Sequence, residues 1–305
     1  MIAACQLKGF TVKGALRVTD QNQAKEPTTG KTPPVIEPVT SVRLGSLRRD
    51  PKGWLILLLG LGAPLAFFTA AAGGGIGLWG WQAGLGVLPW TALIALITLI
   101  LAIVFIVLNR RKGQKTRWPL MGLGMLGSLG FLGFLVPYVS AILTLPAIHD
   151  ITTDLADPPQ FTALTLRDDN WDNIPGVDNS DMRGMNPRQR WATVHQDAYP
   201  DIRSVRIDQP VAVVIEKAKR LAEDRGWKVV SVDPAAGHLE ATDTISLFRF
   251  KDDVVIRARS AENGTASIID MRSVSRVGVH DIGANAKRVR RFLSDLSGTT
   301  TAASQ

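Results

Sequence analysis

The sequence predicts a membrane protein in which three transmembrane α-helices precede an α+β domain. Three observations support this fold class: three long apolar stretches, a basic loop between two of them, and a change to mixed polar composition near residue 146. We therefore expect four regions along the chain. They are a disordered cytoplasmic tail at 1–45, a three-helix transmembrane region at 46–145, a periplasmic α+β domain at 146–297 and a disordered tail at 298–305.

The first region is rich in Thr, Pro, Lys and Gln and shows no apolar periodicity. Such a composition buries too little apolar surface to offset the entropy of ordering, so we expect no fixed structure there. The only cysteine of the chain, Cys5, lies in this tail. The sequence therefore offers no intramolecular disulfide and no cysteine-based metal site.

The apolar stretches run from Trp54 to about Ala72, from Leu88 to Leu108 and from Leu120 to Leu143. Each is long enough to cross the hydrocarbon core of a bilayer, which takes roughly 20 helical residues. None of them contains Asp, Glu, Lys, Arg or His. Because such residues mark proton and ion paths inside membranes, a transport function is disfavoured.

The third stretch carries Gly124, Gly127, Gly130 and Gly133 at intervals of three. Small residues let helix backbones approach closely, either inside one bundle or between copies of the chain, so a homo-oligomer remains open. With Gly122 the pattern also spells G-x-G-x-x-G, but no soluble strand precedes it. A dinucleotide-binding turn is therefore not expected.

The net charge of +8 is unevenly distributed: residues 1–53 carry +5, residues 54–144 carry +5 and residues 145–305 carry −2. A protein that binds nucleic acid through the phosphate backbone needs a basic domain, and the large soluble region here is slightly acidic. Nucleic acid is therefore disfavoured as a partner.

The same charges orient the chain in the membrane. Basic residues precede the first stretch and fill the loop at 109–118, whereas the loop at 72–87 has none. By the positive-inside rule, the N-terminus and the loop at 109–118 are cytoplasmic. We therefore expect a multi-pass protein of the cell inner membrane whose C-terminal domain lies in the periplasm.

The C-terminal domain begins with a long stretch that lacks periodicity. Residues 146–161 show no strong pattern, and residues 167–202 are dense in Asp, Asn, Gly and Pro. We expect an irregular loop of about thirty residues, a length that is typical of functional or disordered loops.

Regular patterns resume at Pro210. They predict, in order, a helix, four strands separated by short turns, and a final helix; one turn is expected at Asp252-Asp253. The order predicts an antiparallel four-stranded sheet with both helices on one face. The expected bounds are 210–226 and 283–296 for the helices, and 227–232, 238–248, 254–261 and 265–274 for the strands. In the last helix we expect Arg288 on the polar face, away from the sheet.

Strand alternation brings polar residues onto the sheet face opposite the helices. Asp281 and Asn285 then lie at the end of the sheet, where the last helix starts. The residues expected on that shared face are Glu240, Arg257, Arg259, Asp270, Arg272 and Arg276.

Three segments resemble a known family: "IHDITTD" at 148–154, "LEATDTISLFRFKDDVVIRARS" at 239–260 and "IDMRSVSRVGVHDIGANAKRVRRFL" at 269–293. Together they are similar to the domain-of-unknown-function family 1499 of proteobacteria and plastids, over residues 146–297. The resemblance implies no activity. Its motif positions correspond to His149, Asp150, Thr153, Asp154, Glu240, Thr242, Asp252, Asp253, Arg257, Asp270, Arg272, Ser273, Ser275, Arg276, Gly278, Asp281 and Asn285.

Three functional hypotheses follow. Guanidinium groups bind carboxylate or phosphate bidentately, so the polar face is a candidate site for an anionic ligand or an envelope partner. A structural alternative is that the polar face is a network of Arg–carboxylate pairs that fixes strand register. In this hypothesis the membrane helices build an oligomeric scaffold. The candidate binding residues are Glu240, Arg257, Asp270, Arg272, Ser275, Arg276, Asp281, Asn285, His149, Asp150 and Asp154.

The third hypothesis is an envelope hydrolase that uses Ser275 or His149 with Asp154 or Asp281. The sequence contains no G-x-S-x-G or H-E-x-x-H motif, and its four histidines match no zinc spacing. We therefore expect no metal and no cofactor, and a binding role is favoured over an enzymatic one.

Overall fold

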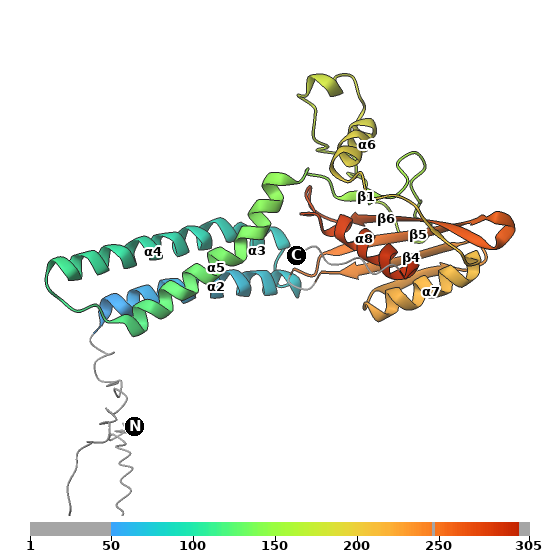
Figure 1. Ribbon diagram of the computed structural model, residues 1–305. Helices are drawn as coiled ribbons and strands as arrows, with labels where there is room; N and C mark the ends of the chain where they lie inside the picture. Colours follow the sequence, from blue (N-terminus) through green and yellow to red (C-terminus); the bar gives the residue numbers. More distant parts are fainter. Residues whose placement is uncertain (1–49, 246–247, 299–305) are drawn as a thin grey trace, which may run out of the picture. The chain divides into compact units, whose positions relative to one another are not determined.

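The computed structural model describes residues 50–245 and 248–298 (Figure 1). The tail expected at 1–45, with Cys5, lies outside the described residues, as does nearly all of the tail expected at 298–305. In the described part, three helices are long and apolar enough to cross a membrane.

These three helices are α2 (Pro51–Gly75), α4 (Leu88–Arg111) and α5 (Trp118–Thr144). They confirm the three apolar stretches that the sequence predicts. A short helix, α3 (Trp81–Gly86), lies in the loop between the first two and was not expected. Asp50 starts α2 as its N-cap, where its side chain accepts a hydrogen bond from the Gly53 backbone N–H at 3.0 Å.

Glycines bring α2 and α5 into backbone contact. A Cβ atom added at Gly60 would lie 2.1 Å from the Gly124 carbonyl oxygen, and one at Gly124 would lie 2.3 Å from the Ile56 oxygen. Only glycine allows this approach, as expected for small residues between membrane helices. Gly130 and Gly133 differ, because an added Cβ would meet nothing within 4 Å.

The C-terminal domain contains one antiparallel sheet of six strands, not the four predicted. Its main order is β1-β6-β5-β4-β3, and β2 pairs with β6 beside that path. The strands are β1 (Asp150–Thr152), β2 (Val205–Ile207), β3 (Lys228–Asp233), β4 (His238–Thr244), β5 (Lys251–Ala261) and β6 (Ala266–Ser275). The two additional strands, β1 and β2, have three residues each, too few to show an alternating pattern.

Two amphipathic helices, α7 (Val211–Asp224) and α8 (Ala284–Ser297), cover one face of this sheet, as predicted (Figure 1). That face contributes Leu239, Ile256 and Met271, which pair across neighbouring strands and are fully buried. Together with the apolar sides of both helices, they form the main core of the domain.

A further helix, α6 (Pro187–Ala198), lies inside the stretch that we expected to be a loop. Its start is stabilised by a capping box, in which the Asn186 and Gln189 side chains each bind the other's backbone N–H group. The helix satisfies polar groups along the edge strand β1. Trp191 Nε1 donates to the Asp150 carbonyl at 2.8 Å, and the Thr152 N–H donates to His195 Nε2 at 3.2 Å.

The turn between β4 and β5 also differs from the prediction. β4 ends at Thr244, and Asp252 and Asp253 lie within β5 rather than in a turn. Both carboxylates are almost fully buried, and each pairs with an arginine. These pairs explain how the strand tolerates two adjacent acids.

Candidate functional site

The sheet face opposite α7 and α8 carries the predicted row of polar side chains. The register places Glu240, Arg257, Asp270 and Arg272 on this one face. However, the face is not open. An irregular stretch at residues 153–170, here called the covering segment, lies over it and contacts each of these four residues.

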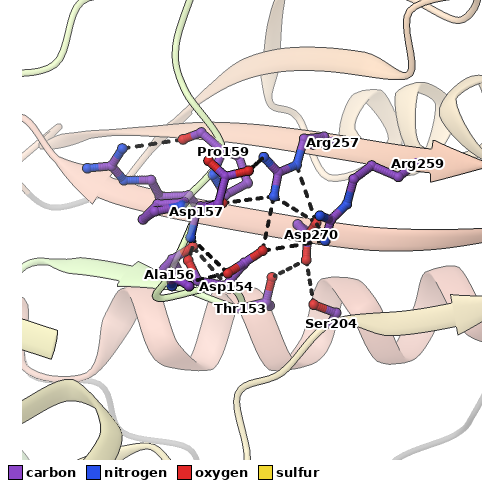
Figure 2. A network of polar contacts seen from close by, with 12 residues as sticks. Thr153, Asp154, Ala156, Asp157, Pro159, Ser204, Arg257, Arg259 and Asp270 are labelled. Atoms are coloured by element: carbon purple, nitrogen blue, oxygen red, sulfur yellow. Dashed lines mark hydrogen bonds and ion pairs between the residues drawn. The ribbon is translucent and has the colours of Figure 1, made fainter. Parts of the chain in front are cut away.

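Asp270 is the centre of the first polar cluster (Figure 2). Its side chain is fully buried, and its Oδ2 lies 3.0 Å from Arg257 Nη2 and 2.8 Å from Arg259 Nη2. Its other oxygen accepts hydrogen bonds from the Thr153 and Ser204 hydroxyls. One carboxylate therefore joins β5, β6, the start of the covering segment and the chain just before β2.

Arg257 links this cluster to the covering segment. Its Nη1 lies 2.7 Å from Asp157 Oδ2, and its Nη2 contacts the Asp157 carbonyl at 2.8 Å and Asp154 at 3.2 Å. Asp154 Oδ1 also accepts from the backbone N–H groups of Ala156 and Asp157, which forms a tight turn. The arginine thus holds this turn against the sheet.

Arg272 and Asp150 form the most deeply buried pair of the face, with 2% and 1% of their side chains exposed. The pair is bidentate: Nε lies 3.0 Å from Oδ1 and Nη2 lies 2.7 Å from Oδ2. The remaining donor, Nη1, reaches the Pro159 carbonyl at 3.3 Å, and the guanidinium carbon lies 5.9 Å from the centre of the Phe161 ring. Asn170 donates to Asp150 from the far end of the covering segment at 2.8 Å.

Glu240 binds the covering segment through backbone groups. Its carboxylate accepts from the N–H groups of Thr162, Ala163 and Leu164 at 2.6, 3.0 and 2.6 Å, and His238 Nε2 lies 2.8 Å away. Burial opposes ionisation, but the His238 contact and the three N–H groups outweigh it and lower the pKa of Glu240 to about 2. The residue therefore acts as an ionised acceptor within a concave row of N–H groups.

Arg276 lies at the margin of the covering segment. Its guanidinium contacts Asp253 at 2.7 and 2.8 Å and the Thr242 hydroxyl at 3.2 Å, and 40% of its side chain is exposed. A cavity beside it, bordered also by Phe161 and Arg167, has a volume of about 10 Å³. That volume holds about one water molecule and no organic substrate.

Ser275 and Asn285 do not share this face. They lie on the helix side, in a second buried cluster centred on Arg288, which donates to Asp243 at 2.8 Å and to Asp252 at 2.7 Å. The prediction that Arg288 is on the polar face of its helix is wrong, because only 6% of its side chain is exposed. Arg288 lies three residues after Asn285 and four before Phe292, so all three lie on one side of the helix. This spacing could have predicted that Arg288 is buried.

Asn285 organises this second cluster. Its Nδ2 donates to Ser275 Oγ at 2.9 Å and to the His149 carbonyl at 3.0 Å, and its Oδ1 accepts from Ser273 and Arg288. Asp281, whose pKa is raised by burial, accepts from the Asn285 N–H in the first turn of α8 at 2.9 Å. These contacts join β1, β6 and α8.

Ser275 and His149 are neighbours, since the Ser275 N–H donates to the His149 carbonyl at 3.0 Å, but in the described part of the chain no hydrogen bond joins the side chains of the hypothetical hydrolase. Ser275 is bonded to Asn285, and Asp154 is bonded to arginines. The His149 ring is nearly fully buried, with Nδ1 3.4 Å from the Val279 carbonyl, and burial together with the nearby Arg167 lowers its pKa. Within the described residues, neither the Ser275 nor the Asp154 side chain is hydrogen-bonded to a histidine ring. The same part of the chain contains no group of three His, Cys, Asp or Glu side chains that could hold a metal ion.

Residues 150–296 match the model of the family described as "Protein of unknown function (DUF1499)". The matched residues lie in the C-terminal domain and make up slightly less than half of the chain. The match confirms the resemblance that the three sequence motifs indicate. No curated protein matches the chain. In the region similar to this family, most motif positions contact one another: they form the buried pairs that hold the covering segment and the first turn of α8.

Proposed function

We propose that this chain is an inner-membrane protein whose DUF1499 domain lies in the periplasm and recognises an envelope partner or an anionic ligand. The N-terminus is then cytoplasmic. The charge distribution supports this orientation, since all basic residues between Gly53 and Thr144 lie at 110–117, in the last turn of α4 and the connection to α5. A reporter fused after Gln305 tests it: activity of a periplasmic reporter supports the orientation, and activity of a cytoplasmic reporter alone contradicts it.

Half-exposed arginines at the margin of the covering segment support a binding role. The Arg259 side chain is 48% exposed, and in the described part of the chain its contacts with Asp154 and Asp270 all use Nη2. In the described part of the chain, Nε and Nη1 have no hydrogen-bond partner, so both donors are free to bind a further acceptor. An arginine held at one end by a buried carboxylate is preorganised to bind a further carboxylate or phosphate.

A site-specific crosslinker placed in the full chain tests this surface. We expect a photoreactive residue at Arg259 to give a discrete adduct in cells, because the donors there face a partner. The matched control is Arg220, an exposed arginine on α7, on the other side of the sheet. Equal adducts from both positions, or none from Arg259, would contradict the proposal.

The anionic-ligand form of the proposal has its own test. Inorganic phosphate should raise the unfolding temperature of the purified chain, and Arg259→Gln should remove that increase. Arg220→Gln should leave it unchanged. If phosphate has no effect and the Arg259 crosslink appears, the ligand is a protein partner rather than a small anion.

The open glycines of α5 favour a second role as an oligomeric scaffold. An added Cβ at Gly130 or Gly133 meets nothing within the described chain, so these positions offer a flat surface to a second copy. Gly130→Leu should then convert an oligomer to a monomer in detergent, as measured by light scattering. A wild-type chain that is already monomeric would contradict this role.

A further inference from the structure

The connection between β4 and β5 has an unusual composition for a loop of a soluble domain. Ile245, Phe248 and Phe250 lie within six residues, and Arg249 between the two phenylalanines is exposed. Surface loops normally carry polar and turn-forming residues, so a solvent-exposed role does not explain this pattern. The two phenylalanine rings stack, with centroids 5.2 Å apart and planes inclined by 10°.

Both rings also contact the membrane helices. Phe250 meets the Trp81 ring of α3 edge-on at 5.6 Å, and Phe248 meets the Phe67 ring of α2 at 6.3 Å. Phe248 belongs to the apolar cluster that Phe67 forms with Phe131 of α5. These aromatic contacts are favourable beyond the apolar area that they bury.

A glycine of α3 makes room for the loop. A Cβ added at Gly84 would lie 3.2 Å from the Phe248 ring and 2.9 Å from the Ala70 carbonyl. The short helix is therefore packed closely between α2 and the inserted ring.

The position of Phe67 along α2 gives the depth of the loop. Phe67 precedes the last residue of α2, Gly75, by eight positions, which corresponds to about 12 Å along a helix. A ring that packs against Phe67 therefore lies below the membrane interface, if α2 spans the bilayer. The end of the bundle near α3 also exposes Trp79 and Trp90, which is typical of an interfacial aromatic belt.

We propose that residues 248–250, just before β5, insert into the membrane and bind the acyl region of the lipid leaflet next to the DUF1499 domain. Phe248 and Phe250 occupy the apolar layer beside α2 and α3, and Arg249 extends to the phosphate layer. The domain is then held to the membrane at two points, the end of α5 and this loop. This inference is independent of the side of the membrane on which the domain lies and of any partner.

Single-cysteine variants of the full chain test the inference. In a Cys5→Ser background, Ile245→Cys reports on the loop without removing either phenylalanine, and Val230→Cys on β3 is the matched exposed control. Each variant is labelled with an environment-sensitive fluorophore and reconstituted in phosphatidylcholine vesicles. The quenchers are nitroxide-labelled lipid and iodide, with iodide present on both sides.

We expect lipid nitroxide to quench the probe at 245 more strongly than the probe at 230, and iodide to show the reverse order. Adding Phe248→Ala and Phe250→Ala should abolish lipid quenching at 245, while the domain remains folded. Iodide quenching at 245 as strong as at 230 would overturn the inference. So would lipid quenching at 245 that survives the double alanine change.

Discussion

The two faces of the sheet are covered by different kinds of chain and are held by different forces. On one face, α7 and α8 pack apolar stripes against Leu239, Ile256 and Met271. On the other, the covering segment has no helix or strand, and its main anchors are Asp270, Arg272 and Glu240. An irregular segment has no continuous apolar stripe to bury, so it is held by individual polar contacts whose geometry depends on particular side chains.

This difference explains the polar character of the family motifs. A helix-covered face tolerates exchanges among apolar residues of similar volume. A charged pair under an irregular segment does not, because removal of one partner leaves the other buried and unpaired. The motif residues on the face under the covering segment thus have a structural role without any ligand. The binding surface that we propose therefore lies at the margin of that segment, where Arg259 and Arg276 are partly exposed.

The largest effect is expected from breaking the most buried pair. Asp150→Ala leaves the Arg272 guanidinium without its carboxylate and should lower the free energy of unfolding by about 3–5 kcal/mol. The measurement is denaturant unfolding of the full chain in detergent.

A paired replacement serves as the control for this prediction. Asp150→Leu together with Arg272→Met removes both charges and should recover most of the loss, because apolar residues of similar volume often replace buried ion pairs at little cost. A single Asp150→Ala change that costs less than about 1 kcal/mol would show that the pair behaves as an exposed one and that the face is not closed.

The next largest effect concerns pH at the edge strand β1. Burial lowers the pKa of His195 from 6.5 to about 4, against the attraction of Asp150, and its Nε2 must stay unprotonated to accept from the Thr152 N–H. The unfolded chain therefore binds more protons between these pH values, and stability is fully present above pH 6.5 and falls as the pH drops towards 4. At about 1.4 kcal/mol per pH unit the loss amounts to about 3 kcal/mol.

Unfolding of the chain at a series of pH values measures this loss. His195→Gln keeps an acceptor but does not titrate, so its stability should change less over the same range. If the variant and the wild type show the same slope between pH 6.5 and 4, another group is responsible and the edge contact is not the sensitive one.

A smaller effect is expected where the covering segment meets Glu240. Glu240→Gln leaves one acceptor oxygen for the N–H groups of Thr162, Ala163 and Leu164 and should cost about 1–3 kcal/mol. The pKa of Glu240, about 2, is below its ordinary value of 4.5. Its contribution is therefore present above pH 4.5 and is lost as the pH falls towards 2.

Proteolysis provides the measurement for Glu240, because release of the covering segment exposes its backbone. Cleavage within 153–170 should increase in Glu240→Gln at neutral pH, while α7 and α8 stay protected. Cleavage that spreads equally to the helix-covered face would show that the two faces open together.

The part of the fold with regular patterns follows from the sequence, and the part without them does not. The two helices and four long strands show clear periodicity, which explains why their order is correct. Asp252 and Asp253 suggest a turn because acidic pairs favour turns, and only their distant partners Arg288 and Arg276 explain why they lie in a strand.

For the polar face, strand parity correctly groups Arg257, Asp270 and Arg272, but it contains no information about what covers them. Their partners Asp154, Asp157 and Asp150 lie about one hundred residues or more away in the chain, in a stretch with no periodicity. The capping box that begins at Asn186 could have predicted the start of helix α6, although the surrounding residues are typical of loops.

The smallest effect is expected for an ion pair outside both covered faces. Arg206 on β2 contacts Asp208 and Glu262, and all three side chains are about half exposed or more. Arg206→Gln should lower the free energy of unfolding least among these variants, because water hydrates both carboxylates when the arginine is removed. Added salt should reduce the difference further. Asp150→Ala, in contrast, should be almost insensitive to salt. Similar losses for the two variants would contradict the view that burial determines how much a charged pair contributes to stability.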